Sequence, residues 1–428
     1  MTEPYEVEPL AAPPNVTVRV PGSRSFTNRA LVAAALADGT SRIEGALTAD
    51  DTGAMADNLA RLRIPVVADP EAETIEVEGT AGRLPEGSFE LDARLSGTTS
   101  RFLLPLLALG PGRYRLDGHE PLRSRPMGST IDALRELGAE VLEEGATGHL
   151  PVTVGGPVLG GSVEVPGDVS SQFLSGLLLA APAMPRGLRV TLTTELVARP
   201  FVEMTLETME AFGARVGVAG ESFSVAPAGY QAATYAVEPD AGAAGYFFAA
   251  AALTGGRVVV EGLHRRSRQG DLQLLDVLAS MGADVSETGA GLAVRGPARL
   301  RGGTFDLSAM PDTAPTVAAL APFASDEVRV TGVGFIRGHE SDRIASIVGE
   351  LRRCGVDAEE EAEGFVIRPG PVAPAELETH DDHRLAMGFA LMGLVAPGIR
   401  IADPEVVGKT FPSYFRALDQ LRETVGSG

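Results

Sequence analysis

The chain is poor in cysteine, lysine and tryptophan, and it has no long apolar run. A single cysteine, Cys354, excludes an intramolecular disulfide framework and fits a reducing compartment. The longest apolar stretches, such as 102–109 and 246–254, are far shorter than the roughly 20 residues of a membrane span. The acidic start, Met1–Glu6, lacks a basic and an apolar region, which predicts a cytoplasmic protein with no signal peptide and no membrane contact.

Positive charge is also scarce, because 36 basic residues face 57 acidic ones. The formal net charge is −21, and an acidic chain of this kind lacks the basic face that nucleic acid requires. Lysine occurs once, at Lys409, so the other 35 of the 36 basic residues are arginines. Any anionic substrate must therefore be bound by a few focused cations, and a lysine that survives such a bias towards arginine is a candidate for one of them.

A unit of helix, glycine turn and two short strands recurs along the 428 residues, which are too many for one hydrophobic core. Glycine accepts the left-handed conformation that ends a helix. The turn glycines stand 75, 69 and 73 positions apart, at Gly138, Gly213, Gly282 and Gly355. This period suits a small βαβ-type subdomain and predicts an α/β protein of two domains. The alternative is an ordinary α/β protein with coincidental spacing.

Three segments place small hydroxyl residues, glycine or arginine at the start of an apolar helix: 21–29, 95–101 and 167–174. Free backbone N–H groups at a helix start attract anions, and arginine adds charge-assisted hydrogen bonds. Each segment alone is equally compatible with simple capping. Together they indicate sites for an anionic ligand.

A second group of segments combines carboxylates with cations. Asp312 lies in an apolar stretch, where an acid is costly unless it is paired or used. Glu340 and Arg343 are predicted to share a helical face at i and i+3, beside His339. The alternative is a structural cluster of caps and ion pairs. The remaining members are Arg125, the segment 381–384 and the segment 408–412. No metal-ligand spacing, Ser-His-Asp arrangement or P-loop lysine is present.

In this order, the motifs resemble those of the 5-enolpyruvylshikimate-3-phosphate synthase family of enolpyruvyl transferases, from about residue 16 to residue 421. The matching stretches are Pro-Gly-Ser-x-Ser-x-x-Asn-Arg, Ser-Ser-Gln-Phe-Leu, Gly-His-Glu-Ser-Asp-Arg, Asp-His-Arg-Leu-Ala-Met and Gly-Lys-Thr-Phe-Pro. The resemblance implies an inside-out α/β barrel of two domains, each with three βαβαββ repeats around buried helices. It implies an upper, acceptor-binding domain of residues 22–237 and a discontinuous lower domain of residues 1–21 and 238–428.

The resemblance also implies a reaction. The family transfers the enolpyruvyl group of phosphoenolpyruvate to the 5-hydroxyl of shikimate-3-phosphate and releases phosphate, with no metal or organic cofactor. Its members are commonly monomers. By position, the catalytic residues are Asp312, which accepts the hydroxyl proton, and Glu340, which transfers protons at the methylene carbon, with His339 beside them. Phosphoenolpyruvate is held by Arg125, Arg343, Arg384 and Lys409, helped by Gly97 and Gln172. The acceptor is held by Arg24, Ser25, Arg29, Ser170 and Ser171.

Several positions depart from the family pattern. Arg24 and His339 replace lysines, and Leu95 replaces an asparagine. Ala198 and Phe201 replace a serine and a tyrosine that contact the acceptor, so hydroxyl groups are lost on that side. The phosphoenolpyruvate side is nearly complete, whereas the acceptor side is thinned.

Two alternatives therefore stay open. The chain is a paralogue of specialised metabolism that acts on a different or unphosphorylated shikimate-like cyclic acid, by transfer or elimination. Or it is a relative that only binds an anion, although retention of Asp312 and Glu340 argues against this. The branch of the family that uses UDP-N-acetylglucosamine does not fit, because its catalytic cysteine has no counterpart near Arg125.

Overall fold

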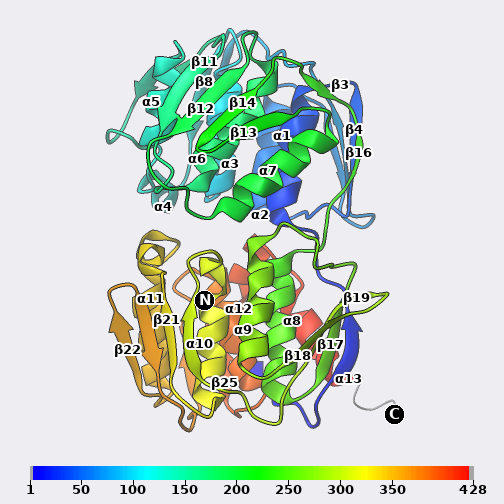
Figure 1. Ribbon diagram of the computed structural model, residues 1–428, viewed down its shortest axis with the longest axis vertical. Helices are drawn as coiled ribbons and strands as arrows, with labels where there is room; N and C mark the ends of the chain where they lie inside the picture. Colours follow the sequence, from blue (N-terminus) through cyan, green and yellow to red (C-terminus); the bar gives the residue numbers. More distant parts are fainter. Residues whose placement is uncertain (1–2, 424–428) are drawn as a thin grey trace. The chain divides into compact units, whose positions relative to one another are not determined.

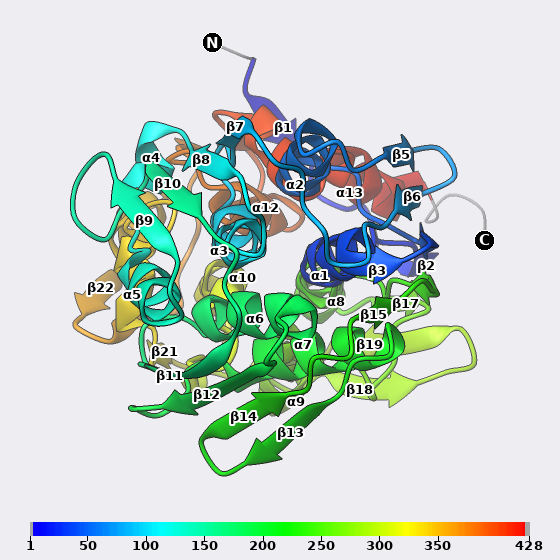
Figure 2. The same ribbon diagram turned by 90° about the horizontal axis from the view of Figure 1, so that it is seen from above.

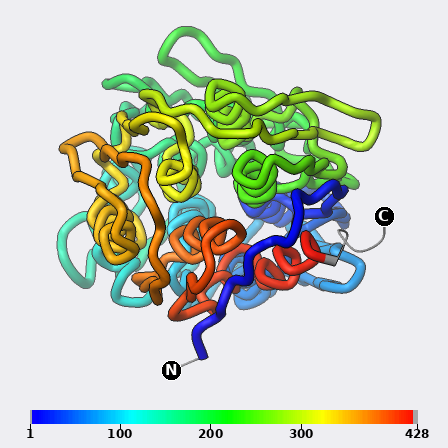
Figure 3. Tube along the Cα trace, turned by 90° about the horizontal axis from the view of Figure 1, so that it is seen from below, coloured from blue at the N-terminus to red at the C-terminus, as the bar shows by residue number. Residues whose placement is uncertain are grey.

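The computed structural model describes residues 3–423 and divides the chain into two compact units. Gly22–Glu238 forms the continuous unit, and Met1–Pro21 with Pro239–Gly428 forms the interrupted unit. Because both chain ends contribute to the interrupted unit, strand β1 (Tyr5–Val7) pairs with β25 (Ile399–Ile401). Figure 3 shows the blue N-terminal segment running beside the orange and red C-terminal segments.

The βαβαββ repeat is clearest at the end of the continuous unit. Its sheet has the order β11-β12-β14-β13, in which β11 and β12 are parallel and the other neighbours antiparallel. The turn glycine of this copy, Gly213, has φ +84°, as expected after a helix. Its elements are β11 (Gly161–Val165), α6 (Ser171–Ala180), β12 (Leu188–Leu192), α7 (Arg199–Ala211), β13 (Val216–Ala219) and β14 (Ser222–Val225).

The other two copies of the continuous unit follow the same plan. One comprises β7 (Ser88–Asp92), α3 (Gly97–Leu107), β8 (Arg113–Asp117), α4 (Glu120–Arg123), α5 (Gly128–Glu136), β9 (Glu140–Glu143) and β10 (Val152–Gly155). The first comprises α1 (Arg24–Leu36), β3 (Ala37–Asp38), β4 (Thr40–Glu44), α2 (Asp50–Arg61), β5 (Val66–Asp69) and β6 (Thr74–Glu78). The far end of the unit completes this copy, because β15 (Tyr230–Gln231) pairs with β3 and β16 (Thr234–Ala236) pairs with β4.

The interrupted unit contains two full copies and one shortened copy. The first runs from β2 (Asn15–Val18) to α8 (Ala241–Thr254), β17 (Arg257–Glu261), α9 (Leu274–Ser280), β18 (Asp284–Glu287) and β19 (Gly291–Arg295), so the continuous unit is inserted after β2. The second comprises β20 (Gly303–Asp306), α10 (Ala314–Leu320), β21 (Val328–Thr331), α11 (Arg343–Arg353), β22 (Ala358–Glu361) and β23 (Gly364–Ile367). The last comprises β24 (Ala375–Leu377), α12 (His383–Gly393), β25 and α13 (Tyr414–Glu423), and β1 takes the place of its hairpin.

Helices form the centre of each unit and sheets form its outside. Every residue of α12 is buried, as is every residue of α8 from Ala241 to Ala252, the pattern of a helix that is apolar on all faces. Strand β4 instead alternates exposed and buried residues. In Figures 1 and 2 the strands β11 to β14 lie outside α3 and α6 within the continuous unit. The predicted inside-out α/β fold is therefore confirmed. Between residues 3 and 423, no helix is long and apolar enough to cross a membrane.

Glycine permits a close helix contact in each unit. A Cβ added to Gly176 of α6 would lie 2.3 Å from the backbone oxygen of Arg101 in α3. A Cβ added to Gly388 of α12 would lie 3.0 Å from the backbone oxygen of Pro315 in α10. These helices carry or adjoin most of the predicted site residues, so their approach distance matters for the site.

Candidate functional site

The predicted site residues are divided between the two units. The acid–cation cluster of the interrupted unit contains Asp312, His339, Glu340, Arg343, Arg384 and Lys409. The helix-start residues of the continuous unit are Arg24, Ser25, Arg29, Gly97, Arg125, Ser170, Ser171 and Gln172.

Most residues of the acid–cation cluster lie in short helical turns or at a helix start. Asp312 lies in the 3-10 helix η3 (Pro311–Thr313) directly before α10, and Lys409 ends the 3-10 helix η6 (Pro404–Lys409). Arg343 is the first residue of α11. Glu340 lies in the turn between η5 (Gly334–Gly338) and α11, so the predicted shared helical face is wrong. The two side chains still meet, because the turn folds back over the helix start.

Arg343 is the centre of this cluster and is only 1% exposed. Its Nη1 donates to Asp312 Oδ1 at 2.7 Å, its Nη2 to Glu340 Oε2 at 2.9 Å and its Nε to Asp382 Oδ2 at 2.6 Å. His339 Nδ1 lies 3.2 Å from Nη1. Burial lowers the pKa of Arg343, but the three carboxylates outweigh it and raise the pKa well above its ordinary value. Arg343 therefore stays charged and locked in place.

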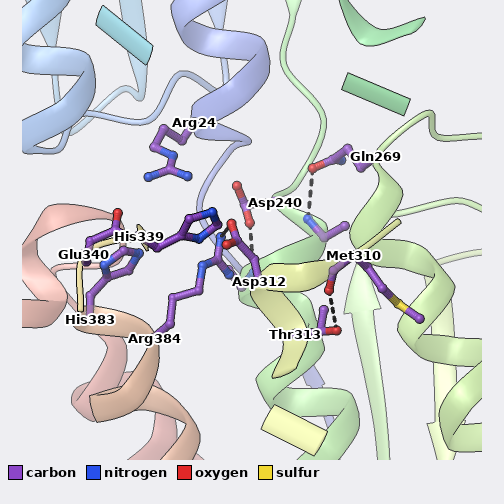
Figure 4. Close-up of polar contacts among 12 residues, drawn as sticks. Arg24, Asp240, Gln269, Met310, Asp312, Thr313, His339, Glu340, His383 and Arg384 are labelled. Atoms are coloured by element: carbon purple, nitrogen blue, oxygen red, sulfur yellow. Dashed lines mark hydrogen bonds and ion pairs between the residues drawn. The ribbon is translucent and has the colours of Figure 1, made fainter. Parts of the chain in front are cut away.

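Each of the two catalytic candidates lies between two cations. Asp312 contacts Arg343 and, through Oδ2, Nη2 of Arg384 at 2.8 Å. Glu340 contacts Arg343 and, through Oε1, Nζ of Lys409 at 2.8 Å. Figure 4 shows Asp312, Glu340, His339 and Arg384 together at the ends of their elements. The cluster thus places two candidate catalytic carboxylates among three cations, partly buried.

The cations control the protonation of Asp312. Burial raises its pKa, but Arg384, Arg343 and His339 outweigh burial and hold the pKa well below its usual range. Nearby, burial raises the pKa of the Tyr246 hydroxyl to about 12, with Arg384 acting in the opposite direction. Asp312 is therefore an ionised acceptor in the absence of ligand. Within residues 3–423, no group of three or more His, Cys, Asp or Glu side chains could hold a metal ion.

Asp382 belongs to the cluster, although sequence reasoning offered only helix capping for it. It is fully buried and is the N-cap of α12, where its carboxylate accepts from the backbone N–H of Arg384 at 2.9 Å. The same carboxylate holds Arg343. The sequence does show a capping residue directly before His383 and Arg384 of a family motif, and this position could have indicated that Asp382 belongs to the site. Its pairing with a residue 39 positions away was not visible in the sequence.

In the continuous unit, Arg29 is buried in α1 with 1% exposure. Its guanidinium donates to Thr205 Oγ1 and to the backbone oxygens of Ser25 and Phe201, each at 2.8 Å. Burial lowers the pKa of Arg29 to about 9. These three acceptors are neutral. Among residues 3–423 no carboxylate pairs with Arg29, so its charge is available to an anion.

The starts of α3 and α6 come together around Gly97. Nη1 of Arg101 donates to Gln172 Oε1 at 2.6 Å, and Gln172 Nε2 donates to Thr98 Oγ1 at 3.2 Å. A Cβ added to Gly97 would lie 3.3 Å from Nη1 of both Arg101 and Arg125. The glycine therefore leaves room for two guanidinium groups over the helix start. Arg101 was part of a predicted segment but was not among the predicted site residues.

The remaining positions of the continuous unit are capping or paired residues. Ser170 caps α6 and accepts from the backbone N–H of Gln172, and Ser171 begins the helix. Arg24 pairs with Asp51 at 2.8 Å. Two of the positions that depart from the family pattern lie at the start of α7: Ala198 is its N-cap with φ 50° and provides no side-chain cap hydrogen bond, and Phe201 supplies its backbone oxygen to Arg29.

Comparisons with known proteins agree with one another. The family model described as EPSP synthase (3-phosphoshikimate 1-carboxyvinyltransferase) matches residues 11–418. The 3-phosphoshikimate 1-carboxyvinyltransferase of Nostoc punctiforme is 44% identical and aligns over 98% of this chain and 99% of its own length. The 3-phosphoshikimate 1-carboxyvinyltransferase of Methanosphaerula palustris is 40% identical and aligns over 95% of this chain and 96% of its own length. A solved EPSP synthase of Acinetobacter baumannii superimposes with a TM-score of 0.84, at 26% identity, over 98% of both chains.

Proposed function

Because the chain belongs to the EPSP synthase family, we propose that it transfers the enolpyruvyl group of phosphoenolpyruvate to the 5-hydroxyl of shikimate-3-phosphate and releases phosphate. The observation that carries the proposal is the placement of Asp312 and Glu340, each between two cations of the acid–cation cluster. Two carboxylates supply a base and an acid, and the cations supply partners for a substrate with a carboxylate and a phosphate.

Asp312 acts as the base for the attacking hydroxyl. In the free protein its pKa is depressed, which makes it a weak base. A substrate anion that engages Arg384 draws this cation from Asp312, and the pKa of Asp312 then rises towards its ordinary value. Substrate binding therefore activates the base. The hydroxyl oxygen bonds to C2 of phosphoenolpyruvate as its proton passes to Asp312.

Glu340 transfers protons at the methylene carbon. In its protonated form Glu340 first delivers a proton to C3, which yields the tetrahedral intermediate and leaves a carboxylate. It then removes a proton from C3 while the bond between C2 and the phosphate oxygen breaks, so phosphate leaves and the double bond returns. Lys409 and Arg343 hold the Glu340 carboxylate in place. His339 lies beside Arg343, where its ring can donate or accept a proton. In this scheme Arg343 is too tightly paired to bind substrate unless one of its carboxylates is displaced.

The helix-start residues of the continuous unit take the acceptor and part of phosphoenolpyruvate. Arg29 suits the acceptor's carboxylate, because its charge is buried among neutral partners. Ser170 and Ser171 at the start of α6 suit a phosphate. Arg125 stands over Gly97 for the phosphoenolpyruvate side.

A specific observation favours a second candidate acceptor. Ala198 offers no hydroxyl at the start of α7, and Phe201 contributes only a backbone oxygen. Both changes remove groups that would bind a phosphorylated acceptor. An unphosphorylated or otherwise altered cyclic acid is therefore the alternative substrate.

Phosphate release from phosphoenolpyruvate, with shikimate-3-phosphate or with shikimate as acceptor, decides between the two. Turnover with shikimate-3-phosphate supports the main proposal, and turnover with shikimate alone supports the second candidate. The variant Ala198→Ser sharpens the comparison, because a restored hydroxyl lowers the KM only for a phosphorylated acceptor. Absence of phosphate release with either acceptor contradicts both.

Replacement of Glu340 by glutamine tests the proton-transfer step. The amide keeps the size and the hydrogen-bond acceptor but cannot carry the proton, so kcat falls by about 10² to 10⁴ while substrate binding is retained. Rapid-quench assays and equilibrium binding measure the two effects. An unchanged kcat would remove Glu340 from the mechanism.

A further inference from the structure

Glu350 is a buried carboxylate that the proposed reaction does not use. It lies in α11, seven residues after Arg343, and is 3% exposed. Seven residues are nearly two helical turns, so the two side chains share one face of the helix. Glu350 Oε2 accepts from the backbone N–H of Glu378 at 3.1 Å, and Oε1 lies 3.0 Å from His380 Nε2. Arg353 Nε lies 3.2 Å from the same carboxylate.

The segment that Glu350 holds is strained. His380 has φ 51° and Asp381 has φ 56°, so two successive residues with side chains adopt the left-handed conformation. This conformation costs free energy in any residue with a Cβ and persists only where neighbouring contacts enforce it. Both side chains are exposed, and therefore core packing does not explain the geometry.

The strained turn determines where α12 begins. It joins β24 to α12 through 378–382, and the backbone N–H of Asp382 bonds to the oxygen of Thr379 at 2.8 Å. Asp382 then caps α12, and Arg384 stands in the first helical turn. Helix α11 thus bonds to this connection at two places. Arg343 contacts Asp382, and Glu350 contacts residues 378 and 380.

We propose that Glu350 is a positioning residue for the phosphoenolpyruvate site, acting by holding the left-handed turn that sets the place of Arg384. The role rests on the proposed function, because Arg384 is one of the cations assigned to that substrate. Without the carboxylate, the turn relaxes to a conformation without strain and the first turn of α12 shifts. Arg384 then leaves Asp312, with which it is now paired at 2.8 Å.

The test is the variant Glu350→Ala, measured by phosphate release with shikimate-3-phosphate as acceptor. Its KM for phosphoenolpyruvate rises about tenfold to a hundredfold, as for a displaced binding group, while kcat changes by less than about threefold. Adding Asp381→Gly restores most of the affinity, since glycine adopts the left-handed conformation without strain. Asp381→Gly alone leaves the KM within about twofold of the parent's.

A control removes a more exposed carboxylate–histidine contact elsewhere. Glu287 Oε1 lies 2.8 Å from His264 Nδ1 in the same unit, so Glu287→Ala also deletes a carboxylate–histidine contact, and it leaves the KM unchanged. If Glu350→Ala does not fold, His380→Ala decides, with a KM about threefold higher expected. An unchanged KM in these variants, or no recovery with Asp381→Gly, overturns the positioning role, even if the melting temperature falls. An inactive parent overturns the proposed function as well.

Discussion

At the scale of single residues, Arg29 carries the clearest energetic signature of a ligand site. The guanidinium is almost wholly buried, and its hydrogen bonds go to a hydroxyl and to two backbone oxygens. Burying a charge without a counter-charge costs stability. Burial lowers its pKa to about 9, so this cost is fully present below pH 9 and declines only as the pH rises above it. An anionic substrate would relieve the cost.

We expect Arg29→Gln to weaken binding of the acceptor without lowering the stability of the fold. The KM for the acceptor rises by about tenfold to a hundredfold, because a charge-assisted hydrogen bond is lost. The melting temperature stays level or rises, because the buried charge is gone. Kinetics and calorimetry at pH 7 measure both quantities. Arg42→Gln is the control, since Arg42 is exposed and paired with Glu76 at 2.7 Å, and it should leave the KM unaltered. A lower melting temperature with an unchanged KM would assign Arg29 to structure alone.

At the scale of elements, one helix pair in each unit sets the spacing of that unit's site residues. In the continuous unit α3 and α6 meet at Gly176, and the bond between Arg101 and Gln172 joins the same two helices at their starts. In the interrupted unit α10 and α12 meet at Gly388. Within each unit, the site residues therefore depend on two helices that approach closely because a glycine has no side chain.

Gly176→Ala should separate the first pair. The new Cβ would lie 2.3 Å from the backbone oxygen of Arg101, which cannot yield like the end of a side chain. We expect a loss of about 1–3 kcal/mol in the free energy of unfolding and a higher KM for phosphoenolpyruvate. Gly349→Ala is the matched control, because nothing lies within 4 Å of its Cβ position in α11. That variant should gain up to about 1 kcal/mol. Equal denaturation midpoints for both variants would contradict this account.

Elements whose signals are local could be predicted from the sequence. The segments 21–29, 95–101 and 167–174 were predicted to open helices, and α1, α3 and α6 begin within them, at Arg24, Gly97 and Ser171. Signals that depend on distant partners were missed. Glu340 lies in a turn rather than on a helix. The left-handed pair at His380 and Asp381 has no local mark, because it is imposed by Glu350.

At the scale of the whole molecule, the chain passes between the units at two points that are adjacent within each unit. The backbone N–H of Asp240 bonds to the oxygen of Pro21 at 2.9 Å in the interrupted unit. That of Ser23 bonds to the oxygen of Glu238 at 2.8 Å in the continuous unit. Each unit also has a hydrophobic core of its own. The two ends of the continuous unit are therefore hydrogen-bonded neighbours.

Residues 22–238 should accordingly fold without the rest of the chain. We expect a single cooperative transition in thermal unfolding followed by circular dichroism. A fragment of residues 22–225 is the control, because it lacks β15 and β16, which pair with β3 and β4 at the beginning of the unit. That fragment should unfold without a sharp transition. Similar transitions for the two fragments, or none for the longer one, would show that the closing strands do not define an independent unit.

Lys409 gives the molecule a built-in reporter of its own unfolding. It is the only lysine of the chain, its side chain is 12% exposed, and Glu340 holds its amine. A protease that cleaves after lysine therefore has one bond to cut, which divides the chain into fragments 1–409 and 410–428. Because cleavage requires the site to open, the rate at which these two fragments form measures how often the interrupted unit loosens around its acid–cation cluster. Ligands that tighten this cluster would slow the same single cut.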